Sequence, residues 1–213
     1  MAGSLNRGEP GLHSHVQNGH NIMATNPMPV YSADDVLHLP IPPGLAGYEL
    51  VDGELEPVMP VGLNHGRIAG QLFTLLDAHV KQQHIRGRVY VEAGFVLGLR
   101  RDPQRLRGPD ISFVSQTKLD RAGGEPKGFF HGIPDLAVEI ESAERPRALQ
   151  QRIQDYLDAG TPLVWVIHSE TSAATVYHAD GSARLLREAD ALDGEDVLPG
   201  LTIPLSQLFD SSN

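Results

Sequence analysis

The chain has 213 residues, 40% of them hydrophobic, and a formal net charge of -10 at pH 7. This length and apolar content suffice for one domain with its own core and argue against two. The sequence has no apolar run of about 18 residues, so no transmembrane helix is expected. It has no cysteine, which excludes disulfides and thiolate metal sites.

The acidic balance also bears on partners and compartment. It argues against a protein that coats nucleic acid without specificity, because Lys and Arg drive phosphate binding. It leaves open an enzyme of nucleic acids, since a local basic strip can lie on an acidic body and acidic side chains can hold a metal. A chain without cysteine fits the reducing cytoplasm, and the first residues lack the apolar centre of a signal peptide.

Residues 1–30 are rich in Gly, Asn, Ser and His and show no hydrophobic periodicity. We expect a disordered tail here, followed by one ordered domain over residues 31–209. His13, His15 and His20 admit two interpretations, a metal-binding tract or a tail that merely contains histidine.

The first expected elements are a short helix, a hairpin and a long helix. Ser32 followed by two aspartates is typical of a helix cap, and the prolines from Pro40 onward end that helix. Alternating apolar residues on both sides of Asp52-Gly53 predict a hairpin over residues 48–58. A long helix is predicted over residues 64–83, where one stripe recurs at helical spacing, formed by Ile68, Leu72, Leu75, Leu76 and His79.

The rest of the chain predicts strands around one further helix. Strands are expected at residues 89–93, 95–97, 110–114, 134–141 and 163–167, the last buried on both faces because it is an unbroken apolar run. Loops are expected at residues 100–108 and around Gly123-Gly124. The second helix, residues 146–159, ends at Gly160.

The C-terminal part predicts an appended hairpin. Residues 174–177 and 183–186 flank Asp180-Gly181, a dipeptide that favours a two-residue turn. Residues 201–209 are expected to pack back on the body. The fold class is therefore α/β, a mixed sheet flanked by helices with an appended C-terminal hairpin.

Two acidic residues stand out because they open or interrupt apolar strands. Asp110 precedes the apolar residues 111–114, and Glu139 lies inside the strand at 134–141. Charged residues rarely lie in a core strand unless they are paired or bind a metal. If the two strands are neighbours, both carboxylates can converge into a hard-cation site. The alternative is that both are strand-end acids in solvent or in ion pairs with nearby arginines.

An ordered set of motifs resembles the Uma-two family of restriction endonucleases, once catalogued as a domain of unknown function. The set runs YELVDGEL at 48–55, His65 opening a helix, PDISFV at 109–114, PDLAVEI at 134–140, and YLDAGTP at 156–162 leading into VWVI at 164–167. The resemblance covers roughly residues 32–209. It implies a PD-(D/E)XK nuclease fold of the restriction-endonuclease type, a divalent metal, Mg²⁺ or Mn²⁺, and hydrolysis of phosphodiester bonds.

The resemblance also assigns roles to residues. Asp110 and Glu139 match the family's metal-binding and catalytic carboxylates. The family's lysine, which stabilises the transition-state charge, lies on the helix four residues before the Tyr, where this chain has Arg152. The chain has Glu141 at the lysine position of the standard nuclease motif, and Ala148 where the family tends to have an Asp. Arg152 keeps the positive charge but does not readily lose a proton.

Other residues keep two interpretations at this stage. His65 has a role near the site or caps and packs its helix. Glu54 and Glu92 line the site or are solvated strand charges, and Trp165 is a core residue or a base-stacking platform. The arginines also have two interpretations: they form a basic rim that binds a phosphate backbone, or they belong to a solvated polar loop. They are Arg100, Arg101, Arg105 and Arg107 before Asp110, and Arg145, Arg147 and Arg152 on the helix side.

The leading hypothesis is a cytoplasmic, metal-dependent endonuclease with Asp110, Glu139 and Arg152 as its catalytic residues. Its expected partner is nucleic acid, DNA before RNA, with no membrane association and with a homodimer left open. The competing hypothesis is a catalytically degenerate nuclease-fold protein that acts as a binding or assembly module. The acidic composition and the departures at positions 148 and 152 favour this second class.

Overall fold

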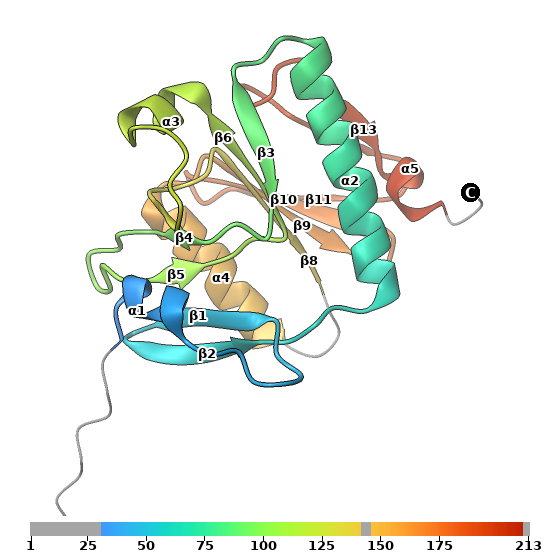
Figure 1. Ribbon diagram of the computed structural model, residues 1–213. Coiled ribbons are helices and arrows are strands. Elements are labelled where there is room, and N and C mark those ends of the chain that lie inside the picture. The colour runs from blue at the N-terminus through green and yellow to red at the C-terminus, as the bar shows by residue number, and fades with distance from the viewer. Residues whose placement is uncertain (1–30, 142–145, 211–213) are drawn as a thin grey trace, which may run out of the picture.

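The computed structural model describes residues 31–141 and 146–210. The expectations for residues 1–30, the disordered tail and its three histidines, lie outside this part and stay predictions. Within it, two large sheets and five helices are arranged around an extended core (Figure 1).

The larger sheet has six strands in the order β11-β10-β9-β8-β6-β3. Of its pairings, β8 with β9 is parallel and the others are antiparallel. The parallel pair is connected by the helix α4 (Pro146–Ala159). The strands are β3 (Gly87–Val91), β6 (Ile111–Ser115), β8 (Leu136–Ile140), β9 (Leu163–His168), β10 (Ala173–His178) and β11 (Ala183–Leu186).

The long helix α2 (Leu63–Gln82) and α4 cover opposite faces of this sheet (Figure 1). Ile68, Leu72 and Leu76 of α2 belong to the same buried cluster as Val138. Tyr156 of α4 packs in another cluster with Ala137 and Val164. Strand alternation therefore turns Ala137 and Glu139 toward α4 and Val138 toward α2, as the sequence pattern predicts.

A second sheet of five strands, in the order β2-β1-β5-β4-β7, lies beside α4. One mixed sheet is expected from the sequence, but the described part of the chain has two large sheets and a separate two-stranded one, β12-β13. The chain leaves the larger sheet after β3 at Glu92, whose φ of 50° turns the backbone away from an extended path. The strands are β1 (Gly47–Val51), β2 (Glu54–Val58), β4 (Phe95–Val96), β5 (Leu106–Arg107) and β7 (Phe130–His131).

Several local predictions are confirmed. Ser32 caps α1 (Ala33–His38) in a capping box with Asp35. The β1-β2 hairpin turns at Asp52 and Gly53, both with positive φ, and β10 pairs with β11 as expected. Gly160 ends α4 with a φ of 91°.

The expected loop after β6 contains a helix instead, α3 (Gln116–Arg121). Its buried residue is Leu119, and one apolar position cannot show a helical period. The tail packs back on the body through β12 (Ala191–Asp193), β13 (Thr202–Pro204) and α5 (Leu205–Phe209), with Leu205 and Leu208 buried.

Trp165 is fully buried among the strands and the residues of α2, so it is a core residue and not a stacking platform. Among the described helices, none combines the length and the apolar character that crossing a membrane requires.

Candidate active site

Strands β6 and β8 bring Asp110 and Glu139 together. The two strands pair antiparallel with Ile111 opposite Val138, and continuing that register by one residue places Asp110 opposite Glu139. Oδ2 of Asp110 also accepts a hydrogen bond of 2.6 Å from the Ile140 amide. The prediction that these strands are neighbours is confirmed.

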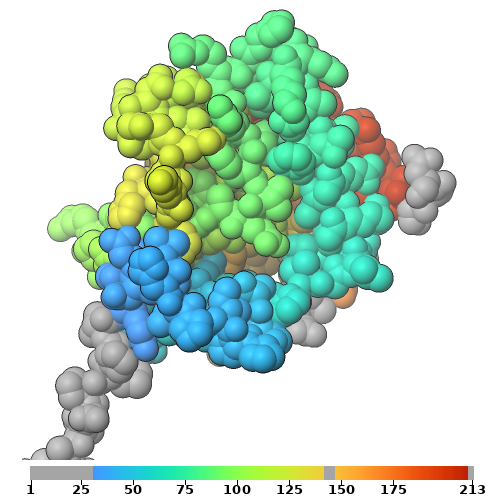
Figure 2. All heavy atoms as spheres, in the orientation of Figure 1, coloured from blue at the N-terminus to red at the C-terminus, as the bar shows by residue number. Residues whose placement is uncertain are grey.

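Both carboxylates line one cavity of about 350 Å³. Figure 2 shows this face of the molecule, where the surface is hollowed between the blue N-terminal segment and the teal start of α2. The walls come from β1, β2 and the segment after it, the start of α2, the start of β6, the end of β8 and α4. The ionisable side chains that line the cavity are Glu49, Glu56, His65, Asp110, Glu139, Glu141 and Arg152.

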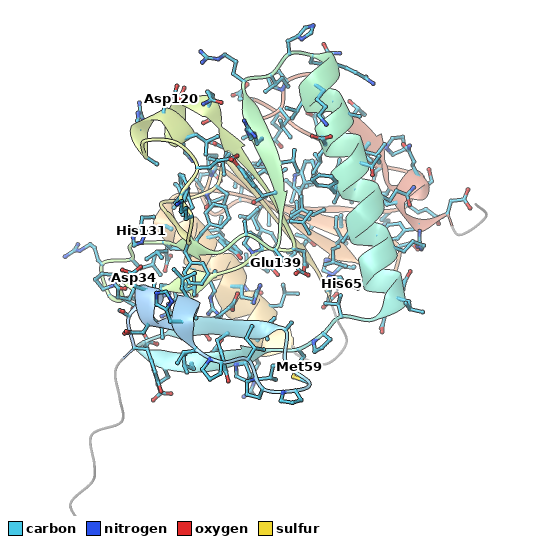
Figure 3. The ribbon with its side chains drawn as sticks, viewed as in Figure 1. Asp34, Met59, His65, Asp120, His131 and Glu139 are labelled. Carbon is cyan, nitrogen blue, oxygen red and sulfur yellow. The ribbon has the colours of Figure 1, made fainter. Side chains whose placement is uncertain are left out.

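His65 lies in the first turn of α2 (Figure 3) and contacts Asp110. Its Nε2 atom is 3.0 Å from Oδ1 of Asp110. Burial lowers the pKa of His65, but the hydrogen bond and the charge of Asp110 outweigh it, so the pKa is raised above its ordinary value. The N-cap of α2 is Gly62, so His65 does not cap the helix and its contact is with the site.

Glu139 is 5% exposed, and its Oε1 atom is held by two donors. The Tyr156 hydroxyl donates at 2.8 Å and Nε of Arg152 at 3.1 Å. Burial raises the pKa of Glu139 to about 7; Asp110 and Glu49 add to this effect, while Arg152 and Tyr156 oppose it. Among the described residues, no donor reaches the other oxygen, Oε2.

Arg152 has all of its nitrogen atoms engaged by protein acceptors. Nε donates to Glu139, one terminal nitrogen lies 2.7 Å from Oε2 of Glu49, and the other donates to the Gly108 carbonyl at 2.7 Å. Burial lowers the pKa of Arg152, but the charges of Glu139 and Glu49 outweigh it and raise the pKa well above its ordinary value. The guanidinium therefore stays charged and acts as a fixed counter-ion.

Sequence reasoning missed Glu49 and Tyr156. Glu49 is 4% exposed, and Arg107 and Arg152 both meet its Oε2 atom at 2.7 Å, while the Gly108 amide donates to Oε1 at 2.8 Å. Its signal in the sequence is an acid between apolar neighbours in a strand, the same signal that singles out Glu139. Tyr156 lies one helical turn after Arg152, so helical spacing places both on one face of α4.

Two of the four arginines just before Asp110 face inward. Arg105 and Arg107 are each 1% exposed, and both pair with the fully buried Asp155 of α4. Arg101 reaches the same carboxylate at 2.5 Å. For the buried Arg105 and Arg107, the expected basic rim and the alternative of a solvated loop are both wrong, whereas the side chain of Arg101 is 51% exposed. With Asp155, these arginines form an internal ion network that joins β5 and the loop before it to α4.

The other residues of the expected rim divide three ways. Arg100 and Arg147 are exposed, Arg145 lies outside the described residues, and Arg152 is tied into the site.

Of the residues left with two interpretations, Glu54 and Glu92 are exposed and do not line the cavity. Glu141 does line it, and its carboxylate accepts from or pairs with Nδ1 of His168 at 2.5 Å. Ala148 lies on the same wall and supplies no carboxylate.

A cation at this position would have few protein ligands. Across residues 31–141 and 146–210, no group of three or more His, Cys, Asp or Glu residues is arranged to hold a metal ion. Asp110 and Glu139 together with water would have to complete the ligand set. Their roles as catalytic and metal-binding residues therefore stay predictions.

The similarity to known proteins agrees with this fold. No curated protein matches the chain. A solved structure described as "a putative nuclease belonging to DUF820 from Anabaena variabilis" superposes with a TM-score of 0.70 at 23% identity, covering 84% of this chain and 97% of that one. The model of the Uma2 family, described as "Putative restriction endonuclease", matches residues 33–206. The chain belongs to the Uma2 family and has its restriction-endonuclease-like fold.

Proposed function

We propose that this protein is a metal-dependent nuclease that hydrolyses phosphodiester bonds of nucleic acid, DNA in the first instance. The observation that carries the proposal is the juxtaposition of Asp110 and Glu139, from two paired strands, on the wall of one cavity. Family membership and the fold of the nuclease relative support it.

The donor set suits a hard divalent cation. Both groups are carboxylates, the ligands that Mg²⁺ and Mn²⁺ prefer. Burial and the neighbouring charges of Asp110 and Glu49 disfavour the ionised form of Glu139, and a cation between the carboxylates would relieve that repulsion. Oε2 of Glu139, without a donor among the described residues, is available to such an ion. When bound, the metal would lower the pKa of water and offset the charge that develops on the phosphate.

The chain's own residues hold the site in shape. Arg152 and Tyr156 fix one oxygen of Glu139, and the Ile140 amide fixes one oxygen of Asp110. Because each nitrogen of Arg152 is bound by a protein acceptor, its charge acts on a phosphate only from a fixed distance. Arg152 cannot accept a proton from water, so it does not serve as a general base. We therefore propose slow cleavage.

The start of α2 supports a place for the phosphate. Its N-cap, Gly62, makes no side-chain cap, and its first turn contains no acidic residue. Gly62 and His65 both line the cavity. Amide groups at the N-terminus of a long helix attract anions, so a phosphate beside the two carboxylates would meet a favourable field there.

Cleavage of supercoiled plasmid tests the proposal. Wild-type protein should nick the plasmid with Mn²⁺, more weakly with Mg²⁺, and not with EDTA. Asp110→Asn and Glu139→Gln keep the shapes of the side chains but remove the charges, and both should be inactive. A wild-type rate equal to that of both variants would remove Asp110 and Glu139 from the reaction.

The degenerate binding module remains the second candidate because one observation favours it. Arg152, the positively charged residue at the position of the family's lysine, has all of its nitrogen atoms bound by Glu49, Glu139 and the Gly108 carbonyl. This candidate predicts that nucleic acid binds without being cleaved under any metal, and that Asp110→Asn leaves binding unchanged.

A further inference from the structure

Three large apolar side chains are exposed on the segment that passes the cavity, and two of them line it. Met59, Val61 and Leu63 alternate along the segment from the end of β2 to the start of α2, and they expose 43%, 48% and 96% of their surface. Met59 and Val61 line the same cavity as Asp110 and Glu139, and Figure 3 shows Met59 on this segment below His65. We call Met59, Val61 and Leu63 the apolar rim.

The apolar rim is not an outlying part of the core. Its three side chains are exposed and are not among the buried or partly buried members of the hydrophobic clusters of the described residues. The other large hydrophobic residues exposed in the described part lie on other segments: Leu37, Ile41, Val91 and Leu185. Apolar side chains gathered beside a cavity point to contact with a ligand.

The charges around the cavity limit how that ligand can be held. Among the described residues that line it, five are acidic and the basic residues are Arg152 and His65, both already in contact with carboxylates. Arg105 and Arg107 are buried in the internal ion network. Duplex DNA is held mainly through its phosphates by free Lys and Arg side chains. The described walls offer little of that kind of binding, and the apolar rim beside them offers another kind of contact.

We propose that the apolar rim binds unpaired bases of a single-stranded stretch of nucleic acid and thereby presents the adjoining phosphodiester to Asp110 and Glu139. The inference rests on the proposed function and adds the substrate class. Base faces are apolar and are available to side chains when bases are unstacked. A cavity of about 350 Å³ is at the small end of ligand sites, which fits an unpaired nucleotide better than a duplex.

Two properties of binding follow from this arrangement. Affinity should depend on the bases, so a strand that lacks them binds weakly. Affinity should also depend little on salt, because few phosphate counter-ions are released when apolar contacts dominate.

The test measures binding by fluorescence anisotropy, with Ca²⁺ in place of Mn²⁺ so that the strand is not cut. The probes are a labelled single strand, its blunt duplex and an abasic strand of equal length. The variants are the triple change Met59→Ser, Val61→Ser, Leu63→Ser and the control Leu185→Ser, which alters an exposed apolar residue on β11. All of these side chains are exposed, and thermal unfolding verifies that each variant folds.

Wild-type protein should bind the single strand at least about tenfold more tightly than the duplex or the abasic strand. The triple variant should lose about tenfold on the single strand and little on the duplex, while Leu185→Ser should match wild type. Equal binding of the single strand by the triple variant and wild type would overturn the inference. In that case the proposed function would still be supported if wild-type protein cleaves the plasmid.

Two other outcomes also count against the inference. A preference for duplex that the triple variant retains would assign recognition to residues away from the rim. A wild-type dimer in sedimentation velocity that the triple variant converts to monomer would make the rim an interface between copies of the chain. If no nucleic acid binds and none is cleaved, the proposed function fails together with the inference.

Discussion

Arg152 and the buried Glu139 form a partly buried ion pair, Nε to Oε1 at 3.1 Å, at the helix position where the family's lysine is expected. The second arm of the guanidinium binds Glu49 and the third binds the Gly108 carbonyl. Arginine can satisfy three acceptors at once through its planar fork, which a lysine ammonium does not reproduce. The substitution therefore exchanges a mobile cation for a fixed one.

Arg152→Lys should be at least as active as wild type in plasmid nicking, because a flexible ammonium can reach the phosphate. Arg152→Ala should lose at least about 100-fold, the usual cost of removing a stabilising cation. Urea unfolding of each variant separates lost chemistry from lost structure, since truncating one member of a buried pair costs about 3–5 kcal/mol. Equal nicking rates in all three folded proteins would show that Arg152 has no role in the reaction.

Glu49→Gln should destabilise the protein by about 2–4 kcal/mol in urea unfolding, because it leaves Arg107 and Arg152 short of a buried counter-charge. The matched control is Glu56→Gln. Glu56 meets the same Arg107 at 2.9 Å, but its side chain is 44% exposed, so the change should cost less than about 1 kcal/mol. Equal losses in the two variants would contradict the central position given to Glu49.

The sequence predicts the elements that repeat a pattern over several residues. The α2 stripe and the unbroken apolar run of β9 require many consecutive positions, and both are found where expected. Strands β4, β5 and β7 have two residues each, too few to show alternation. The division into two large sheets depends on the turn at Glu92, and no residue near Glu92 in the sequence predicts that turn.

The candidate site could be predicted in part for a similar reason. Asp110 and Glu139 are visible because each is a charge at or in an apolar strand, and the pairing of their strands is confirmed. The inward direction of Arg105 and Arg107 could not be predicted, because their counter-ion, Asp155, is on a helix about fifty positions further along the chain. Long-range ion pairing leaves no periodic signal in the sequence.

The pKa of Glu139 predicts how stability varies with pH in the metal-free protein. Because this pKa is raised from 4.5 to about 7, the folded state keeps a proton that the unfolded chain releases between these values. The contribution of Glu139 to the free energy of unfolding should therefore be largest below about pH 4.5. It should fall as pH rises from about 4.5 through about 7, by at most about 3 kcal/mol in total.

Glu139→Gln removes this titration. In EDTA, urea unfolding should show that wild-type protein loses more stability than the variant between about pH 5 and about pH 8. A difference between the two proteins that does not change with pH would contradict the raised pKa of the buried carboxyl.

Calorimetric titration of Mn²⁺ into the metal-free protein tests the central claim, that Asp110 and Glu139 together hold a divalent cation. Wild-type protein should show one saturable binding event near neutral pH or above. Asp110→Asn should lose it, while Glu92→Gln, which changes an exposed acid that does not line the cavity, should retain it. Identical titrations for wild type and Asp110→Asn would contradict the account, whatever activity the protein displays.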